Sequence, residues 1–216
     1  MNAANLPAPP SNISSRSVSI FELDSILYRT HDVGRAPIFF GRARIHRFDS
    51  PDASYGVLYT GRDAFCAFVE TLASAAGTSV VTTAALKRRA LSELKPARPL
   101  RLVDLTVSGA LVRIGADARL FSGSHEIAQL WSRALHDHPS HPDGLLFPSR
   151  LDPARQGIAI FEDRAPKMKE LSRRSWYETG GMRHLLAEIM EHYRFELIEN
   201  QSVVARKPAS RQEGLF

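Results

Sequence analysis

The clearest pattern of apolar and polar positions lies in residues 47–72, where a turn, a strand and a helix follow one another. Pro51 stands among Asp and Ser side chains that bond nearby backbone, which predicts a turn over residues 49–54. Residues 56–60 are apolar and partly β-branched, which favours a strand. Asp63 is a good N-cap, and the apolar residues after it recur at helical spacing: Phe65, Phe68, Val69 and Leu72.

Glu70 lies on the other side of that predicted helix. At 100° per residue it projects roughly 150° from the centre of the apolar face, so it points away from the core. A lone glutamate at such a position is usually a solvated surface residue. The helical pattern by itself therefore gives Glu70 no function.

The same reading predicts elements along the rest of the chain. Further strands are expected at residues 25–30, 100–105, 144–148, 157–161 and 194–198. Further helices are expected at residues 83–94, 124–135 and 182–193, and residues 164–175 form a polar, basic segment. Together they predict one α+β domain over residues 21–200, between a disordered lead-in (residues 1–20) and a disordered tail (residues 201–216).

Composition narrows the class of protein. A chain of 216 residues with 44% hydrophobic and 24% charged residues is that of an ordinary globular domain. Cys66 is the one cysteine, which excludes an internal disulfide and fits a reducing compartment. The N-terminus has no apolar run of the signal-peptide kind, and nowhere do 18 apolar residues follow one another. These features predict a cytoplasmic protein that does not span a membrane.

The net charge of +5 raises the question of nucleic acid. The basic residues are scattered, however, and no zinc-finger spacing, zipper-linked basic region or aromatic RNA-binding motif accompanies them. The charge serves an anionic small ligand or an acidic partner protein equally well, so direct nucleic-acid binding is not favoured. His136, His138 and His141 are separated by prolines and share no helix face, so no metal site is predicted.

Compact catalytic motifs are absent. The sequence has no Gly-x-Gly-x-x-Gly, no phosphate-binding lysine loop, no Gly-x-Ser-x-Gly and no His-Glu-x-x-His. Arg29 is a cation on a half-apolar strand, which by itself predicts a salt bridge at a strand end. Ser149 follows a strand, where a serine ordinarily bonds local backbone. Any active site must therefore be assembled from scattered residues.

Taken in order, six pieces of the sequence resemble the RES domain, a family named for an arginine, a glutamate and a serine. They span roughly residues 24–165: Leu27–Arg29, Arg47–Pro51, Tyr55–Tyr59, Ala67–Thr71, the helix of Trp131, and Gly144–Arg150. The resemblance implies a fold similar to ADP-ribosyltransferase toxins, with a split mixed sheet and flanking helices around an NAD cleft. It also implies an NAD-consuming toxin that assembles with, and is neutralised by, a cognate antitoxin carrying an Xre-like helix-turn-helix.

The resemblance assigns roles by position to four residues, and two neighbouring residues, Tyr28 and Arg150, are further candidates. Arg29, Glu70 and Ser149 match the family's arginine, glutamate and serine as catalytic residues. Three further residues are expected to bind substrate: Tyr59 at an aromatic position of the cleft, Tyr28 beside the arginine, and Arg150 toward the anionic end of the ligand.

The expected chemistry suits these residue types. Cleaving the nicotinamide–ribose bond builds oxocarbenium character, which the Glu70 carboxylate can stabilise. Arg29 offers a fork of donors to the pyrophosphate or an incoming phosphate. Tyr59 can stack on nicotinamide, and Ser149 can bond its amide or a ribose hydroxyl.

NAD is then a substrate rather than a resident cofactor, and phosphate is a candidate co-substrate. The acceptor stays open between phosphate (phosphorolysis), water (hydrolysis) and a protein side chain (ADP-ribosylation). A non-catalytic basic binding module is the competing hypothesis.

Overall fold

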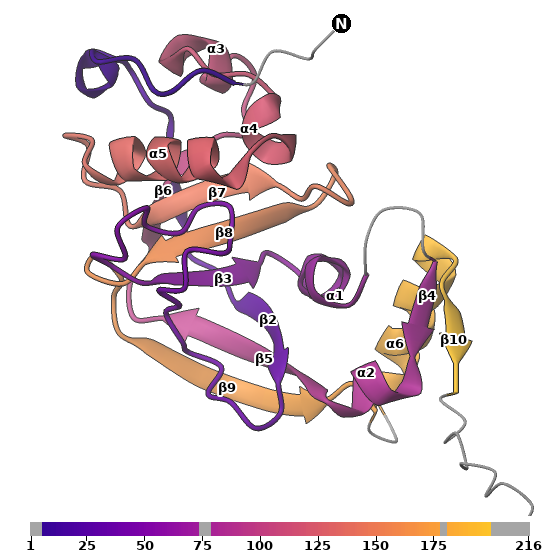
Figure 1. Cartoon of the computed structure of the whole chain (residues 1–216). Helices are drawn as coiled ribbons and strands as arrows, with labels where there is room; N and C mark the ends of the chain where they lie inside the picture. Colours follow the sequence, from indigo (N-terminus) through magenta and orange to yellow (C-terminus); the bar gives the residue numbers. More distant parts are fainter. Residues whose placement is uncertain (1–5, 74–78, 178–180, 200–216) are drawn as a thin grey trace, which may run out of the picture.

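The computed structural model describes residues 6–73, 79–177 and 181–199, and its main feature is a large mixed sheet (Figure 1). Within these residues eight strands lie in the order β1-β6-β7-β8-β3-β2-β5-β9. The strands are β1 (Ile20–Leu23), β2 (Leu27–Asp32), β3 (Val57–Gly61), β5 (Arg89–Pro96), β6 (Leu100–Asp104), β7 (Gly144–Pro148), β8 (Gln156–Phe161) and β9 (Met168–Ser175). β6 and β7 run parallel and the other neighbours antiparallel, so the sheet is mixed.

The sheet opens between β2 and β3. Their register is Tyr28 opposite Gly61, whereas β3 pairs with β8 along its whole length and β2 pairs with β5 from Leu27 to Asp32. Past the Tyr28–Gly61 pair the two strands diverge. The two halves of the sheet, β1-β6-β7-β8-β3 and β2-β5-β9, are thus joined by one short stretch of backbone pairing between β3 and β2.

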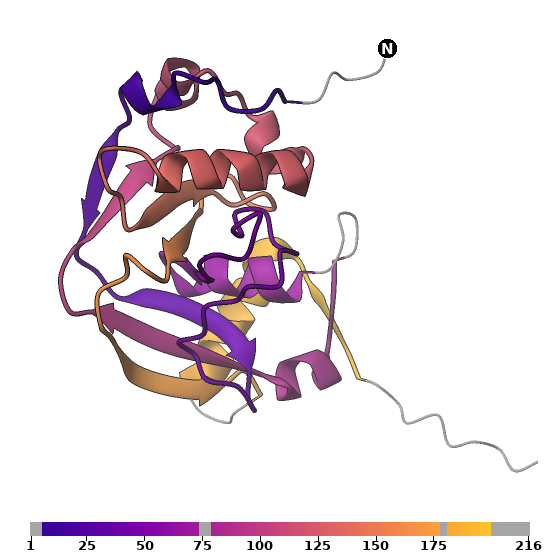
Figure 2. The same ribbon diagram turned by 60° about the vertical axis from the view of Figure 1, so that its left-hand side comes forward.

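Helices cover the sheet in two groups. α3 (Ala110–Ile114), α4 (Arg119–Ser122) and α5 (His125–His136) lie beside β6 and β7 (Figure 1). α1 (Ala64–Leu72) lies beside β2 and β3 (Figure 1). α6 (Gly181–Tyr193) packs in one core cluster with α1, behind which it lies in the turned view of Figure 2. The remaining elements are the 3-10 helix η1 (Ile13–Ser15), α2 (Thr83–Lys87) and a two-stranded parallel sheet of β4 (Val80–Thr82) and β10 (Glu196–Ile198).

Alternate residues of β3 enter different cores, as the pleat of a strand requires. Val57 packs in a cluster with Trp131 of α5, whereas Leu58 packs in a cluster with Leu27 and Leu94 of the other half-sheet. Burial on both faces fixes the register of β3, because a slip by one residue would exchange the two faces. The predicted α+β domain with a split mixed sheet and flanking helices is confirmed.

α1 forms as its sequence predicts. The Asp63 carboxylate accepts a hydrogen bond from the Cys66 amide at 2.8 Å, which satisfies one of the free donors of the first turn. Phe68 is fully buried, and its ring meets Trp176 edge-on with 4.9 Å between centroids. Contacts of this kind hold the helix rigidly against the sheet.

The helix predicted for residues 83–94 is wrong beyond Lys87. Residues 83–87 form α2, and residues 89–96 form β5, which lies between β2 and β9. Two neighbouring strands pair with this backbone, so tertiary pairing outweighs local helix propensity. The polar segment 164–175 likewise contains β9, an edge strand whose side chains alternate largely between half-buried and exposed.

The prediction of a disordered lead-in over residues 1–20 is corrected for residues 6–20. Leu6 is buried, and the carbonyl of Pro7 accepts a hydrogen bond from Trp131 Nε1 at 2.9 Å. One leucine and a few backbone carbonyls make these contacts, which a polar composition does not reveal. Residues 1–5 and the tail 201–216 lie outside the described residues.

Candidate active site

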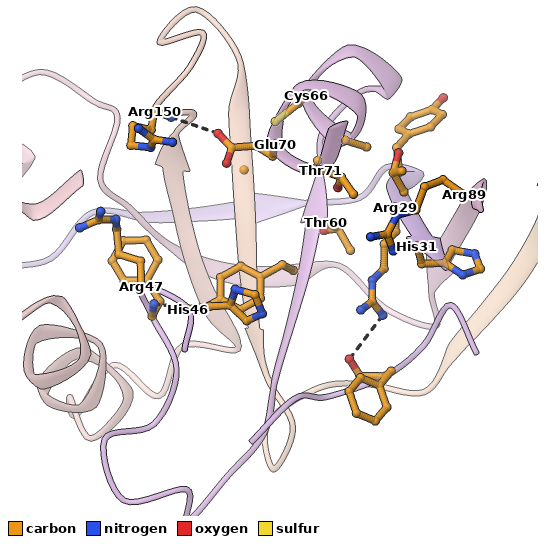
Figure 3. Close-up of a pocket in the computed structure, with 18 of the residues that line it drawn as sticks. Arg29, His31, His46, Arg47, Thr60, Cys66, Glu70, Thr71, Arg89 and Arg150 are labelled. Atoms are coloured by element: carbon orange, nitrogen blue, oxygen red, sulfur yellow. Dashed lines mark hydrogen bonds between the residues drawn. The ribbon is translucent and has the colours of Figure 1, made fainter. Parts of the chain in front are cut away.

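A cleft of about 700 Å³ lies where the sheet splits (Figure 3). β2, β3 and α1 supply much of its lining, together with the loops before β3 and after β7. Five of the six residues assigned from the sequence line it: Tyr28, Arg29, Tyr59, Glu70 and Arg150. The divergence of β2 and β3 therefore brings these distant residues to one place.

Glu70 points from the last turn of α1 toward the loop after β7 (Figure 3). Its Oε1 accepts hydrogen bonds from the Ser149 hydroxyl at 2.5 Å and from the Arg150 amide at 3.1 Å. The buried face of α1 turns Glu70 away from the core, and its side chain stays exposed. The carboxylate is thus both accessible and held in one orientation.

Ser149 lies behind Glu70 and is 1% exposed. Its hydroxyl donates to Glu70 and accepts hydrogen bonds from the amides of Leu151 and Asp152, at 3.3 and 3.2 Å. The single hydroxyl proton is thereby used. The resemblance implied a bond from Ser149 to the ligand, whereas in this structure its partner is Glu70.

Arg155 ties the Ser149 loop to the start of α1. Its carbonyl accepts a hydrogen bond from the Ser149 amide at 2.8 Å, and its guanidinium donates to Asp63 at 2.8 Å. Asp63 is the N-cap of the helix that carries Glu70. One residue therefore fixes the serine and the glutamate relative to each other.

Arg29 lies on the opposite wall of the cleft, on β2 (Figure 3). Its Nη1 donates to the carbonyl oxygens of Pro37 and Phe39. Among the described residues no carboxylate pairs with it, so the strand-end salt bridge is not what the structure shows. Burial lowers the pKa of Arg29 to about 10, which leaves the group cationic at neutral pH.

Tyr59 anchors the loop before β3. Its hydroxyl donates to Asp49 at 3.1 Å and accepts a hydrogen bond from the Phe48 amide at 2.9 Å. Asp49, 1% exposed, also accepts from the amides of Ile45 and His46 at 3.0 Å each. Burial raises the pKa of Tyr59 well above its usual value, so the hydroxyl remains a donor.

Several cleft residues were not assigned from the sequence, among them Arg47, His31 and Arg89. Arg47 donates to the carbonyls of Leu120 and Gly123 at 3.3 and 2.9 Å, and burial and nearby Arg150 lower its pKa. Arg47 belongs to one of the six pieces that resemble the RES domain, and this is the feature of the sequence that could have identified it as a cleft residue. His31 lies on β2 itself, and Arg89 reaches the cleft through the pairing of β5 with β2, which no local pattern in the sequence indicates.

The cleft is strongly basic. Its lining contains two carboxylates, Asp32 and Glu70, and six arginines: Arg29, Arg35, Arg47, Arg88, Arg89 and Arg150. Cations gathered in a concave site raise the local concentration of anions. The ligand that fits such a lining is anionic.

The histidines at and just after the end of α5 have structural partners. His136 stacks on Tyr55 with 4.0 Å between ring centroids, and its ring nitrogens bond Asp137 and Asp163. Within the described ranges, no group of three His, Cys, Asp or Glu side chains is placed to hold a metal ion. Nor does any helix of that part of the chain have the length and apolar character needed to cross a membrane.

Comparison with known protein families identifies the family of this chain. The model of the RES domain family matches residues 26–181, which is well over half of the sequence. The chain belongs to the RES domain family. The resemblance inferred from six short pieces is thereby confirmed, and the match includes Arg29, Glu70, Ser149 and both walls of the cleft.

Two individual proteins are similar to this RES domain. A protein of Sinorhizobium fredii named "Probable toxin y4kH" is 31% identical over 123 residues, which cover 56% of this chain and 93% of that protein. The structure also resembles the crystal structure of the M. tuberculosis MbcT–MbcA toxin–antitoxin complex, with a TM-score of 0.62 and 17% identity. That match covers 82% of this chain and 95% of the other. At this identity the likeness is one of fold.

Proposed function

We propose that this RES domain is the toxin of a toxin–antitoxin pair and that it consumes NAD by cleaving the nicotinamide–ribose bond. Family membership and the printed name of the Sinorhizobium relative support the toxin assignment. One observation supports the chemistry above the others. The Glu70 carboxylate is open to the cleft, held by Ser149 and the Arg150 amide, while cationic Arg29 lines the same cleft.

In the proposed reaction the C1′–N bond breaks and its electron pair leaves with the nicotinamide nitrogen. Positive charge then develops on the ribose, and a carboxylate beside it lowers the energy of that state. Oε1 of Glu70 carries both hydrogen bonds, and Oε2 has no partner among the described residues, so it is free to face the ribose. Nicotinamide leaves as a neutral molecule, and no general acid is required.

Arg29 would bind the pyrophosphate. A guanidinium matches phosphate oxygens through two parallel N–H donors. The Pro37 and Phe39 carbonyls occupy Nη1, which orients the group and leaves its remaining donors for the ligand. Tyr59, with its hydroxyl fixed by Asp49, presents its ring to the cleft for stacking on the nicotinamide.

Inorganic phosphate is the acceptor that we favour. Arg47 and Arg150 lie close enough to each other and to Glu70 to affect the pKa of Arg47. Two cations beside the reacting carbon would hold a phosphate whose oxygen forms the new bond to C1′. The products are then ADP-ribose phosphate and nicotinamide, whereas attack by water gives ADP-ribose.

The test is NAD consumption by the purified protein with and without phosphate. Wild type should consume NAD faster with phosphate, and Glu70→Gln should lower the rate about a hundredfold or more, for an electrostatic contribution of about 3 kcal/mol. Gln keeps an acceptor for Ser149, so the fold should be retained.

The matched control is Glu188→Gln, which changes an exposed helical glutamate of α6 outside the cleft and should leave the rate unchanged. No NAD loss in either condition, or an undiminished rate in Glu70→Gln, contradicts the proposal. Duplex DNA binding with a steep salt dependence would then favour the non-catalytic basic module.

The proposed partner is an antitoxin with an Xre-like N-terminal part, which covers the cleft. Phe39 lines the cleft and is 52% exposed, and Ile45, on the loop that Asp49 holds, is 63% exposed. Exposed apolar side chains beside a basic cleft suit a protein that blocks it. Adding antitoxin should stop NAD loss, and Ile45→Ser should weaken that inhibition, with uninhibited NAD consumption as the control. A complex with the cleft open contradicts this arrangement.

A further inference from the structure

A second cluster of cations lies at the far end of β2. Arg35, Arg88 and Arg89, called here the outer basic group, all line the cleft. Residues 32–35 form a tight turn, in which the Arg35 amide donates to the Asp32 carbonyl at 3.0 Å. Arg89 lies directly opposite Asp32 in the β2–β5 register. The turn and the strand pairing therefore place the three arginines around Asp32 at one end of the cleft.

The charge of the outer basic group is poorly compensated. Asp32 is the one carboxylate among the lining residues at this end, and its Oδ2 lies 4.0 Å from both Arg88 and Arg89. That separation is too long for a hydrogen bond. Its Oδ1 is occupied by the Gly34 amide at 3.0 Å. Three guanidinium groups thus share one distant carboxylate, which favours binding of a further anion.

The position of the group along the cleft identifies that anion. The Cα atoms of Arg29 and Asp32 are separated by three residues of one strand, which is about 10 Å of backbone, and both residues line the cleft. In Figure 3, Glu70 lies on one side of the cleft, and Arg29 and Arg89 lie together on the other side. A dinucleotide with its reacting ribose at Glu70 and its pyrophosphate at Arg29 would extend its adenosine ribose toward Arg89. A distance of that size is spanned by one ribose and its substituents.

We propose that the outer basic group binds a phosphate monoester on the 2′ oxygen of the adenosine ribose, so that the cleft takes NADP at least as well as NAD. This inference rests on the proposed function. In the unrelated Rossmann-type dinucleotide sites, an acidic side chain bonds the free 2′-hydroxyl of NAD, whereas arginine accommodates the 2′-phosphate of NADP, and the same charge logic applies here. A monoester carries about −1.5 to −2 charges at neutral pH, which several arginines can neutralise.

Asp32 is the residue that opposes this preference. Its carboxylate can bond the free hydroxyls of NAD and repels a 2′-phosphate. Asp32→Asn keeps an oxygen for the Gly34 amide and removes the charge. The substitution should therefore raise kcat/KM for NADP relative to NAD.

The experiment compares kcat/KM for NADP and NAD at one phosphate concentration. Wild type should use NADP at least as efficiently as NAD. The double variant Arg88→Gln/Arg89→Gln should lower the NADP-to-NAD ratio of kcat/KM about ten- to a hundredfold, the size expected for charge-assisted hydrogen bonds. Arg35→Gln on the neighbouring turn should lower the same ratio in a chain with an unaltered β5.

Arg183→Gln is the control, because Arg183 is an exposed arginine on α6 outside the cleft. It should leave the ratio unchanged. Consumption of neither dinucleotide overturns the proposed function itself. Consumption of NAD with a lower kcat/KM for NADP than for NAD overturns this inference alone. A higher KM for inorganic phosphate with an unchanged ratio in the double variant also overturns it, because the group would then bind the free ion.

Discussion

The two walls of the cleft are built in opposite ways. The Glu70 wall, formed by Glu70, Ser149 and Arg150, is rich in internal hydrogen bonds that fix a carboxylate. The arginine wall, formed by Arg29 and the outer basic group, has cations with few partners. One wall is complete without ligand, and the other lacks the negative charge that would balance it.

In the proposed function, this difference separates the residues for chemistry from the residues for binding. A catalytic carboxylate must already have its orientation when charge develops on the substrate, since reorganisation at that moment costs free energy. A binding wall works differently, because uncompensated cations become favourable when an anion arrives. Damage to the Glu70 wall should therefore lower kcat, and damage to the arginine wall should raise KM.

Two further variants, one on each wall, sharpen the comparison, and the one on the arginine wall has the larger expected effect of the two. Arg29→Gln should raise KM for NAD about ten- to a hundredfold, because it removes charge-assisted bonds to the pyrophosphate. The free energy of unfolding should change little, since the substitution also removes a half-buried cation without a carboxylate partner among the described residues. Steady-state kinetics and thermal unfolding measure the two quantities.

Arg133 on α5 provides the matched control. It is also half-buried, but its guanidinium donates to Asp52 at 3.2 Å and to Asp137 at 2.9 Å. Arg133→Gln should lower stability by up to about 1 kcal/mol and leave KM unchanged, because it lies outside the cleft lining. An Arg29→Gln variant that loses stability but keeps its KM would show that Arg29 is structural.

Local patterns predicted the scaffold of the Glu70 wall. Asp63 capping, the apolar face of α1 and the strand before Ser149 all depend on residues close in sequence, and each is present in the structure. Helical periodicity also predicts that Glu70 points away from the apolar face of α1. Periodicity does not predict the partner of Glu70, because the Glu70–Ser149 hydrogen bond joins residues 79 positions apart.

The arginine wall was largely hidden from local patterns. Arg89 reaches the cleft only because residues 89–96 pair as β5, where the sequence favoured a helix. Only the family resemblance identifies Arg29 as a site residue, because its proposed role depends on a ligand and not on another part of the chain. Tertiary pairing and ligand charge are the two kinds of information that periodicity does not contain.

The variant with the smaller expected effect is Ser149→Ala on the Glu70 wall, and it tests whether Ser149 positions Glu70. Ser149→Ala removes one of the two donors to Glu70 and the acceptor of two amides. We expect kcat to fall about tenfold with KM nearly unchanged, which corresponds to a loss of about 1.4 kcal/mol in the transition state. Stability should fall by about 1–3 kcal/mol, because the Leu151 and Asp152 amides lose their acceptor.

Two further variants distinguish positioning of Glu70 by Ser149 from a purely structural role of Ser149. Ser132→Ala removes another buried serine hydroxyl, which donates to the Phe48 carbonyl at 2.8 Å, and it should cost similar stability with a much smaller change in kcat. In the Glu70→Gln background, Ser149→Ala should cause little further loss, because residues that act as one unit are not additive. If Ser149→Ala instead raises KM at constant kcat, Ser149 bonds the ligand directly, as the family resemblance implied, and the Glu70 wall is not complete before NAD binds.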